Sequence, residues 1–327
     1  MDSLSRARRA HKILSTSGTH AYEAPGAGDQ RGPCPGLNAL ANNGYINRNG
    51  ITSPTQVITA SKTIGIADDV SAVLAALCVI AGNGVTCSIG NSSGLGGYGL
   101  NKHNFFEGDT SYKSCDCKLC PTHPGCDNYH FNNKAWTTTY NAAQLNGGLF
   151  GIPTFKISAK QRYDECVANN TRCVFGPAQF IFHYGTPCLF AYIFPGDAGV
   201  ASEAIENTWI GISYSGGQRV GKTGGEQIPD NWVPLQSPYT VPELAECILD
   251  LYTANPVALG ANVGAGFVLS PSEQQLPSNP DVNDILCFIY AAIFSSAPTA
   301  SLLAVARYLD PIFTVSPWFC PIFSTGR

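Results

Sequence analysis

One cysteine of this chain stands where its thiolate can be held in a fixed direction. Cys34 lies between two prolines, whose rings fix the backbone and remove two N–H groups. A helical region follows directly, and the N–H groups at a helix start lower the pKa of a nearby thiol. Alone, the Cys-Pro pattern is more typical of a disulfide cysteine in a turn. The whole block reads Arg31-Gly32-Pro33-Cys34-Pro35-Gly36-Leu37-Asn38.

A second block groups several oxygen-bearing residues. Glu107, Gly108, Asp109 and Ser111 lie within five successive residues, and the function of this block depends on the resemblance described below. By themselves, these residues are more typical of a turn in which Asp109 bonds to its own backbone. The nearby His103 is more typical of an exposed or structural histidine than of a ligand.

A third group lies on a helix that we expect to begin at about Pro177. Gln179 and Thr186 are seven residues apart, which is two helical turns, and His183 lies between them on the same face. The imidazole of His183 can act as a base near neutral pH. The alternative is a packed histidine bonded to the backbone. Pro187 should disturb the last turn, because its ring conflicts with the carbonyl of His183.

Together these blocks resemble the haem-thiolate peroxidase family of chloroperoxidase and the fungal unspecific peroxygenases. The resemblance spans about residues 25 to 325. The segments that carry it are Arg31 to Tyr45 with Arg48-Asn49-Gly50, Leu100 to His103 with Phe106 to Ser111, and Ile228-Pro229-Asp230-Asn231-Trp232.

The resemblance implies the cofactors and the chemistry. Haem b would be held by Cys34 as the axial ligand of the iron, and magnesium by Glu107, Gly108 and Ser111 beside a haem propionate. The expected function is that of an oxidoreductase that uses peroxide to oxygenate or halogenate a small organic substrate.

One part of the family pattern is absent. Long peroxygenases carry an Arg and, seven residues later, a Glu that moves the peroxide proton. Gln179 and Thr186 stand at these positions, and neither is a base at neutral pH. Shorter members carry a His where Gly108 stands. We therefore expect His183 to replace the missing base, with Thr186 holding water or peroxide. The alternatives are a haem-containing isomerase, dehydratase or cyclase, and a non-catalytic haem-binding protein.

The fold class expected from the hydrophobic spacing is mainly α, with long loops and few short strands. Residues 1–28 predict a flexible N-terminal arm and residues 29–327 one helical domain. The segment from 83 to 150, rich in Gly, Asn and Cys, predicts long loops with short pieces of structure. Other expected elements are helices near 53, 68–81, 177, 240–252, 279 and 298–308, and a strand over 209–214.

Thirteen cysteines argue for an oxidising compartment, secreted or within the secretory pathway, although the chain shows no signal peptide. Cys166 and Cys173 can close a small loop, and Cys287 with Cys320 resembles a C-terminal pair of the family. Cys78 is expected as a buried thiol. The cluster Cys115, Cys117, Cys120 and Cys126, with His123 and His130 nearby, favours disulfides over zinc.

Composition argues against two classes of partner. Charged residues make up 13% of the chain and the net charge is −4, so there is no basic footprint for nucleic acid. The longest apolar run, Ile285 to Phe294, is about half of the ~20 residues that span a bilayer, and predicts a buried core helix. The expected partners are a small-molecule substrate and hydrogen peroxide.

Overall fold

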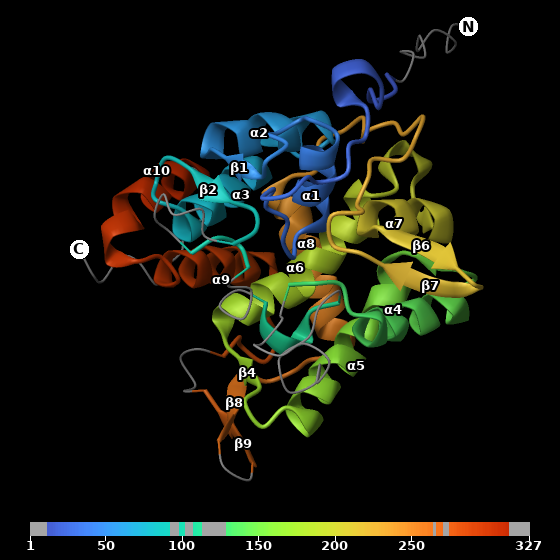
Figure 1. Cartoon of the computed structure of the whole chain (residues 1–327). Coiled ribbons are helices and arrows are strands. Elements are labelled where there is room, and N and C mark those ends of the chain that lie inside the picture. Colours follow the sequence, from blue (N-terminus) through green and yellow to red (C-terminus); the bar gives the residue numbers. More distant parts are fainter. Residues whose placement is uncertain are drawn as a thin grey trace, which may run out of the picture.

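The computed structural model describes residues 12–91, 98–101, 107–112, 129–263, 266–270 and 275–313. Helices dominate these residues, which confirms the mainly α prediction (Figure 1). The helices are α1 (Pro35–Asn42), α2 (Pro54–Thr63), α3 (Asp68–Ala81), α4 (Asn133–Leu145), α5 (Ile152–Asn169), α6 (Pro177–Ile193), α7 (Glu203–Ile210), α8 (Val241–Ala254), α9 (Val282–Ser295) and α10 (Leu302–Phe313).

The strands are short and pair antiparallel in four small sheets. The pairs are β1 (Ile51–Thr52) with β2 (Cys87–Ser88), β3 (Leu149–Phe150) with β5 (Ala201–Ser202), and β6 (Ile212–Ser215) with β7 (Gln218–Gly221). The fourth sheet has the order β4 (Val174–Phe175), β8 (Gly260–Val263) and β9 (Gly266–Leu269).

Helix α6 runs through the middle of the molecule and packs against α5, α8 and α9 (Figure 1). It is buried on most sides, and one continuous core cluster extends from it to all the neighbouring helices. A second group, α2, α3 and α10, packs beside it. Within the described ranges no single helix is long and apolar enough to cross a bilayer. By length and composition alone, Val282–Ser295 and Thr299–Phe313 would be sufficient only when taken together, and this pair is bent by 115°.

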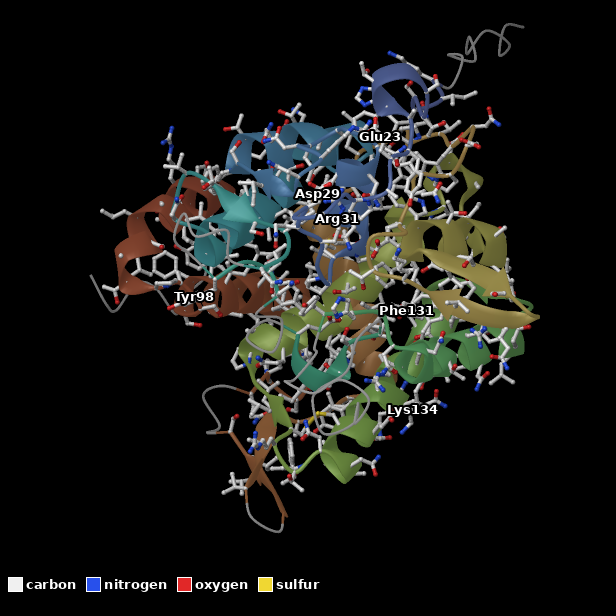
Figure 2. The ribbon with its side chains drawn as sticks, viewed as in Figure 1. Glu23, Asp29, Arg31, Tyr98, Phe131 and Lys134 are labelled. Atoms are coloured by element: carbon white, nitrogen blue, oxygen red, sulfur yellow. A yellow bond between two sulfur atoms is a disulfide. The ribbon has the colours of Figure 1, made fainter. Side chains whose placement is uncertain are left out.

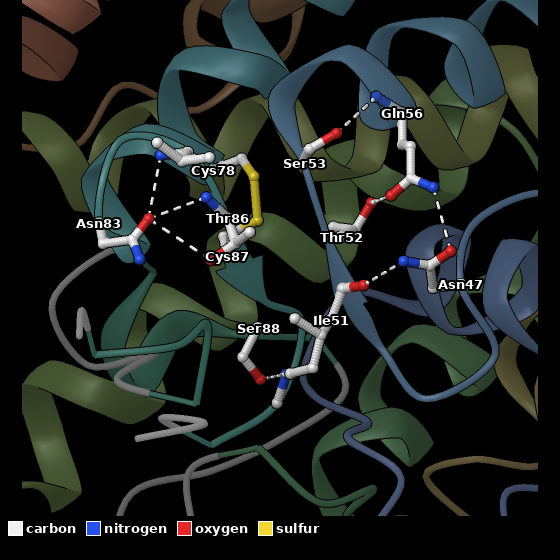
Figure 3. The surroundings of a disulfide bond; sticks show 12 residues. Asn47, Ile51, Thr52, Ser53, Gln56, Cys78, Asn83, Thr86, Cys87 and Ser88 are labelled. Carbon is white, nitrogen blue, oxygen red and sulfur yellow. Dashed lines mark hydrogen bonds between the residues drawn. A yellow bond between two sulfur atoms is a disulfide. The ribbon is translucent and has the colours of Figure 1, made fainter. Parts of the chain in front are cut away.

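Capping explains where several helices begin. The expected capping box at α8 is present, with the Thr240 N–H donating to Glu243 at 2.7 Å. At α2, Ser53 accepts from the Gln56 N–H at 3.2 Å, but the Gln56 side chain turns to Thr52 instead (Figure 3). Helix α9 begins at Val282, two residues later than expected, because the side chain of Asp281 caps it.

Two expectations from local composition were wrong. The segment expected as long loops contains α4, a helix of 13 residues, because Ala135, Trp136 and Ala143 form a buried stripe. Trp209 belongs to α7, which ends at Gly211 in the left-handed conformation (φ 79°), so the expected strand begins only at Ile212. In both places, burial of an aromatic side chain outweighs the local sequence preference.

The expectation that Pro187 disturbs the last turn of its helix was wrong. Pro187 lies inside α6, which continues to Ile193. A proline leaves the carbonyl four residues earlier without its helical donor. That carbonyl belongs to His183, and it accepts a hydrogen bond from the buried Tyr112 hydroxyl at 2.9 Å. The helix therefore passes its proline because a distant side chain satisfies the exposed carbonyl.

Residues 12–28, the described part of the predicted flexible arm, lie along the surface near α1. The Leu14 N–H donates to the Trp232 carbonyl at 2.9 Å, and the His20 ring stacks on Tyr45 with 3.9 Å between centroids. These partners come from distant segments, so the polar composition of the arm does not reveal them.

Three disulfides join described residues: Cys78–Cys87, Cys166–Cys173 and Cys188–Cys247. The Cys166–Cys173 prediction is confirmed. The prediction of a buried thiol at Cys78 was wrong, because the turn after α3 brings β2 back beside it (Figure 3). Cys287 is also disulfide-bonded. Cys320, the cluster Cys115–Cys126 with His123, and His103 lie outside the described residues.

We expect the Cys188–Cys247 disulfide, which ties α6 to α8, to stabilise the fold more than Cys166–Cys173. The bonded residues are 59 positions apart in the first pair and 7 in the second, and a longer closed loop constrains the unfolded chain more. Chain entropy alone makes the difference about 2 kcal/mol. The free energies of unfolding of the two double Cys→Ala variants, measured by denaturant titration, would test this. Equal losses would contradict it.

Candidate functional site

Cys34 stands at the start of α1, in extended backbone just before Pro35. It carries a thiol rather than a disulfide and is half-buried. Its carbonyl accepts the first helical hydrogen bond from the Asn38 N–H at 3.1 Å. The proline at the first helical position costs nothing here, because that N–H has no helical partner in any case.

Cys34 lines an apolar cavity between α1, α3 and α6 that is partly open to solvent. Most of the wall is aliphatic, with side chains such as Leu37, Val73, Leu77 and Leu189. Among the described residues, its polar or ionisable side chains, disulfide cysteines aside, are Cys34, Ser61, Glu107, Ser111, Tyr112 and Thr186. The structure thus brings together four side chains that the sequence singled out in three separate blocks: Cys34, Glu107, Ser111 and Thr186.

The segment from Glu107 to Tyr112 is held in place by buried contacts. Gly108 has a φ of 65°, a left-handed conformation that favours glycine, and the Thr110 hydroxyl donates to the Glu107 carbonyl at 3.2 Å. The side chains of Glu107 and Ser111 are nearly fully buried. This fixes both of their oxygen-bearing groups at one edge of the cavity.

Arg162 and Tyr112 anchor this segment, and sequence reasoning missed both. The buried Arg162 guanidinium on α5 donates to the Ser111 carbonyl at 2.9 Å and pairs with Glu165. The Tyr112 hydroxyl bonds to α6 through the His183 carbonyl. No local pattern marks either role, because each partner lies far away in the sequence.

Helix α6 turns one face to the cavity, through Phe182, Thr186, Leu189 and Ile193. These positions follow helical spacing. His183 is turned roughly 60° from Thr186 about the helix axis, and it does not line the cavity.

His183 is fully buried among aromatic rings instead. Its ring centroid lies 5.8 Å from that of Tyr112, 5.2 Å from Phe175 and 4.7 Å from Tyr184. Burial lowers the pKa of His183 to about 3; the Thr110 backbone opposes this shift and the Arg162 charge adds to it. Its imidazole is therefore neutral at ordinary pH, but it is a weak base.

Gln179 also lies away from the cavity wall. Its side-chain oxygen accepts the Gly176 N–H at 3.0 Å and so caps the start of α6. Gln179 and Thr186 do share a helix face, but seven residues separate them by roughly 10 Å along the axis. Of the three helix residues expected at the site, the structure brings only Thr186 to the cavity.

The Cys78–Cys87 disulfide also lines the cavity, and sequence reasoning missed it. It fastens the end of α3 to β2, whose partner strand β1 leads into α2 (Figure 3). Asn83 stabilises the intervening turn by accepting the Thr86 N–H at 2.8 Å. One wall of the cavity is thus covalently fixed.

The chain matches a known family over most of the segments described above. Residues 20–237 match the family described as "Peroxidase, family 2". The dothistromin biosynthesis peroxidase dotB of Dothistroma septosporum is 32% identical over 275 residues, which cover 78% of this chain and 65% of that protein. This chain therefore spans slightly less than two thirds of that relative.

Two other similar proteins are also named as a peroxidase or a peroxygenase. The aromatic peroxidase fscJ of Fusarium equiseti is 27% identical, with 88% of this chain and 73% of that protein covered. The aromatic peroxygenase of Cyclocybe aegerita is 31% identical, with 54% of this chain and 49% of that protein covered. Given the match over residues 20–237 and a cavity that gathers the cysteine and Glu-Gly-Asp blocks, the chain belongs to peroxidase family 2, the haem-thiolate peroxidase family.

Proposed function

We propose that this protein is a haem-thiolate oxidoreductase that uses hydrogen peroxide to oxidise a small apolar organic molecule. The observation that carries the proposal is the Cys34 thiol in the wall of an apolar cavity whose edge is formed by Glu107 and Ser111. The relatives named peroxidase and aromatic peroxygenase support the same reaction class.

The residues present fit a haem. A porphyrin needs an apolar slot with one ligand on its face and polar groups where the propionates emerge, and Cys34, the aliphatic wall and the Glu107–Ser111 edge offer these features. When bound, a haem with a thiolate ligand supplies an electron-rich iron that favours cleavage of the peroxide O–O bond. Cys34 would hold the iron, and the aliphatic wall would exclude water and receive the substrate.

Magnesium is proposed at the edge of the cavity. Its ligands would be a Glu107 carboxylate oxygen, the Gly108 carbonyl and the Ser111 hydroxyl, completed by a propionate and water. The described residues contain no group of three His, Cys, Asp or Glu that could bind a metal. A site of this mixed kind does not need one, because two of its three protein ligands are a carbonyl and a hydroxyl.

The proton transfer that accompanies peroxide cleavage would be slow. Thr186 faces the cavity where the resemblance places a carboxylate, and its hydroxyl does not accept a proton near pH 7. Burial raises the pKa of Tyr112 well above its usual range, so that phenol stays protonated. We therefore revise the role expected of His183: it supports α6 rather than acting as the base.

The same observation favours a second candidate function. A site with a hydroxyl at position 186 suits an enzyme that isomerises, dehydrates or cyclises one metabolite. The name of dotB supports a biosynthetic role but keeps the peroxidase reaction. The disulfides support an oxidising compartment, and we propose the secretory pathway.

The ligand assignment is tested by spectroscopy. The reduced, CO-bound protein should absorb at the red-shifted position of thiolate ligation, and Cys34→Ala should abolish that band, because the remaining described cysteines of the cavity wall, Cys78 and Cys87, form a disulfide and offer no thiolate. Haem content and circular dichroism measured alongside would separate ligand loss from unfolding. A folded Cys34→Ala protein that keeps the band would exclude Cys34 as the ligand.

Metal analysis tests the magnesium site. We expect about one magnesium per haem, and a large loss of metal in Glu107→Gln, since the carboxylate is the charged protein ligand. Glu246→Gln, an exposed change on α8, is the matched control and should retain the metal. Native protein with full haem occupancy but without a tightly bound divalent ion would rule the site out.

Peroxide kinetics test the role of position 186. Thr186→Glu should speed the reaction with peroxide, up to the roughly 10²–10⁴-fold that a placed proton-transfer group contributes. Thr253→Glu, an exposed change on α8, adds the same charge outside the cavity and should have no effect. Stopped-flow measurement of haem absorbance gives both rates; no gain in a folded, haem-loaded Thr186→Glu variant would show that this side chain does not reach the peroxide.

The pH dependence separates His183 from that role. Because burial lowers the pKa of His183 to about 3, the imidazole is neutral throughout the range in which a histidine base normally titrates. The native rate should therefore show no inflection near the ordinary value of ~6.5. An inflection there that disappears in His183→Ala would restore His183 as the base.

A further inference from the structure

The turn that carries Cys34 is held by one buried asparagine. The Asn38 backbone N–H bonds to the Cys34 carbonyl at 3.1 Å. Its side chain bonds to both polar groups of Gly32: the Gly32 N–H donates to the Asn38 oxygen at 3.0 Å, and the Asn38 nitrogen donates to the Gly32 carbonyl at 2.8 Å. Asn38 is fully buried and thus grips the chain on both sides of the cysteine.

On its other side, Gly32 packs closely against Ile89 and Asn101. A Cβ built at this residue would lie 2.0 Å from the Ile89 carbonyl oxygen and 2.7 Å from the Asn101 side-chain oxygen. The Cys34 turn therefore fills a fixed slot between α1 and the segment after β2. Any movement of the cysteine must stretch the bonds to Asn38 or displace that segment.

Asn38 is in turn held by a buried carboxylate. Glu226 is fully buried, and one of its oxygens accepts from the Asn38 side-chain nitrogen at 2.8 Å. The other oxygen accepts the Gly224 N–H at 2.5 Å. A hydrogen bond to an ionised acceptor is stronger than one between neutral groups, more so away from water. The Asn38 amide is therefore fixed in one orientation.

A buried cation belongs to the same network. Arg31 donates to the Asn42 side-chain oxygen at 2.8 Å, and the Asn42 nitrogen donates to the Glu226 carbonyl at 2.8 Å (Figure 2 labels Arg31). Burial lowers the pKa of Arg31, and the charges of Asp29 and Glu226 oppose that shift. The carboxylate thus lies close to a counter-charge.

We propose that Asn38 and Glu226 are positioning residues that aim the Cys34 thiolate at the haem iron and strengthen it as a ligand. The inference rests on the proposed function, since it takes Cys34 to be the iron ligand. Groups hydrogen-bonded behind a metal ligand commonly orient it and tune its basicity, and their loss typically costs ~10–100-fold in metal affinity or activity. The Glu226 charge acts through the Asn38 amide and the Gly32–Cys34 backbone.

Two substitutions separate charge from shape. Glu226→Gln keeps the side-chain volume but removes the negative charge, and it sets an NH₂ group against either the Gly224 N–H or the Asn38 amide. Asn38→Asp sets two carboxylates face to face. The combination N38D/E226Q restores the donor–acceptor pair between positions 38 and 226, because the new amide can donate to the new carboxylate. The bond to the Gly32 carbonyl is lost in Asn38→Asp and in the double variant alike, so the comparison of these two isolates the pair.

Glu206→Gln is the matched control. Glu206 is also a fully buried glutamate, but it lies on α7, and within the described part of the chain neither of its carboxyl oxygens has a hydrogen-bond partner. Burial raises the pKa of Glu206 well above its usual range. It reports what an isosteric change of a buried glutamate does by itself.

The measurements are the reduced CO spectrum, the Fe(III)/Fe(II) reduction potential and the rate of haem transfer to excess apomyoglobin. In Glu226→Gln we expect a positive shift of the potential, because loss of a nearby negative charge favours the reduced iron. We also expect haem loss to be faster by ~10–100-fold and part of the thiolate CO band to be lost. Glu206→Gln should behave as the native protein, and N38D/E226Q should retain haem better than Asn38→Asp.

The outcomes distinguish the two proposals. Native protein without the thiolate CO band would refute Cys34 ligation and hence the proposed function. A native thiolate band, with Glu226→Gln unchanged in potential, band and haem loss, would overturn the positioning role alone. If neither single variant holds haem, the double variant decides: recovery supports the pairing of Asn38 with Glu226, and no recovery overturns it.

Discussion

The structure depends on holding one thiol at the start of a helix while the space in front of it stays apolar. A thiolate in such a place loses hydration, and burial of a charge without compensation is costly. Cys34 is the residue directly before α1, and its turn is fixed by Asn38 on one side and by the slot around Gly32 on the other. The aliphatic wall of the cavity keeps the space in front of this cysteine apolar.

The opposite wall is organised around a proline. Pro187 deprives the His183 carbonyl of its helical donor, and Tyr112 supplies the replacement from the segment that also carries Glu107 and Ser111. The carbonyl left without a helical donor would weaken an isolated helix, but here its hydrogen bond with Tyr112 links α6 to the polar edge of the cavity. This hydrogen bond joins the helix that carries Thr186 to the segment that carries Glu107, although the two residues come from different blocks.

Sequence alone predicted what depends on short spacing. The helix start at Thr240, the Cys166–Cys173 loop and the meeting of Cys34 with Glu107 follow from local chemistry or from the family pattern. The features that the sequence did not predict depend on which elements pack against each other in the folded protein. The capping role of Gln179 and the Cys188–Cys247 pair both follow from how α6 sits among other elements.

His183 shows the same limit at the site itself. Helical spacing placed it on one face with Thr186, but a turn of roughly 60° is enough to separate the cavity wall from the aromatic core. Which side of that boundary a residue occupies is decided by Tyr112 and Phe175, which come from distant segments. In such a site the residue type sets which reactions a side chain can take part in, and the packing around that side chain decides whether it reaches the cavity. The His183 imidazole is neutral and packs among aromatic rings, whereas the Thr186 hydroxyl, one turn away, lines the cavity.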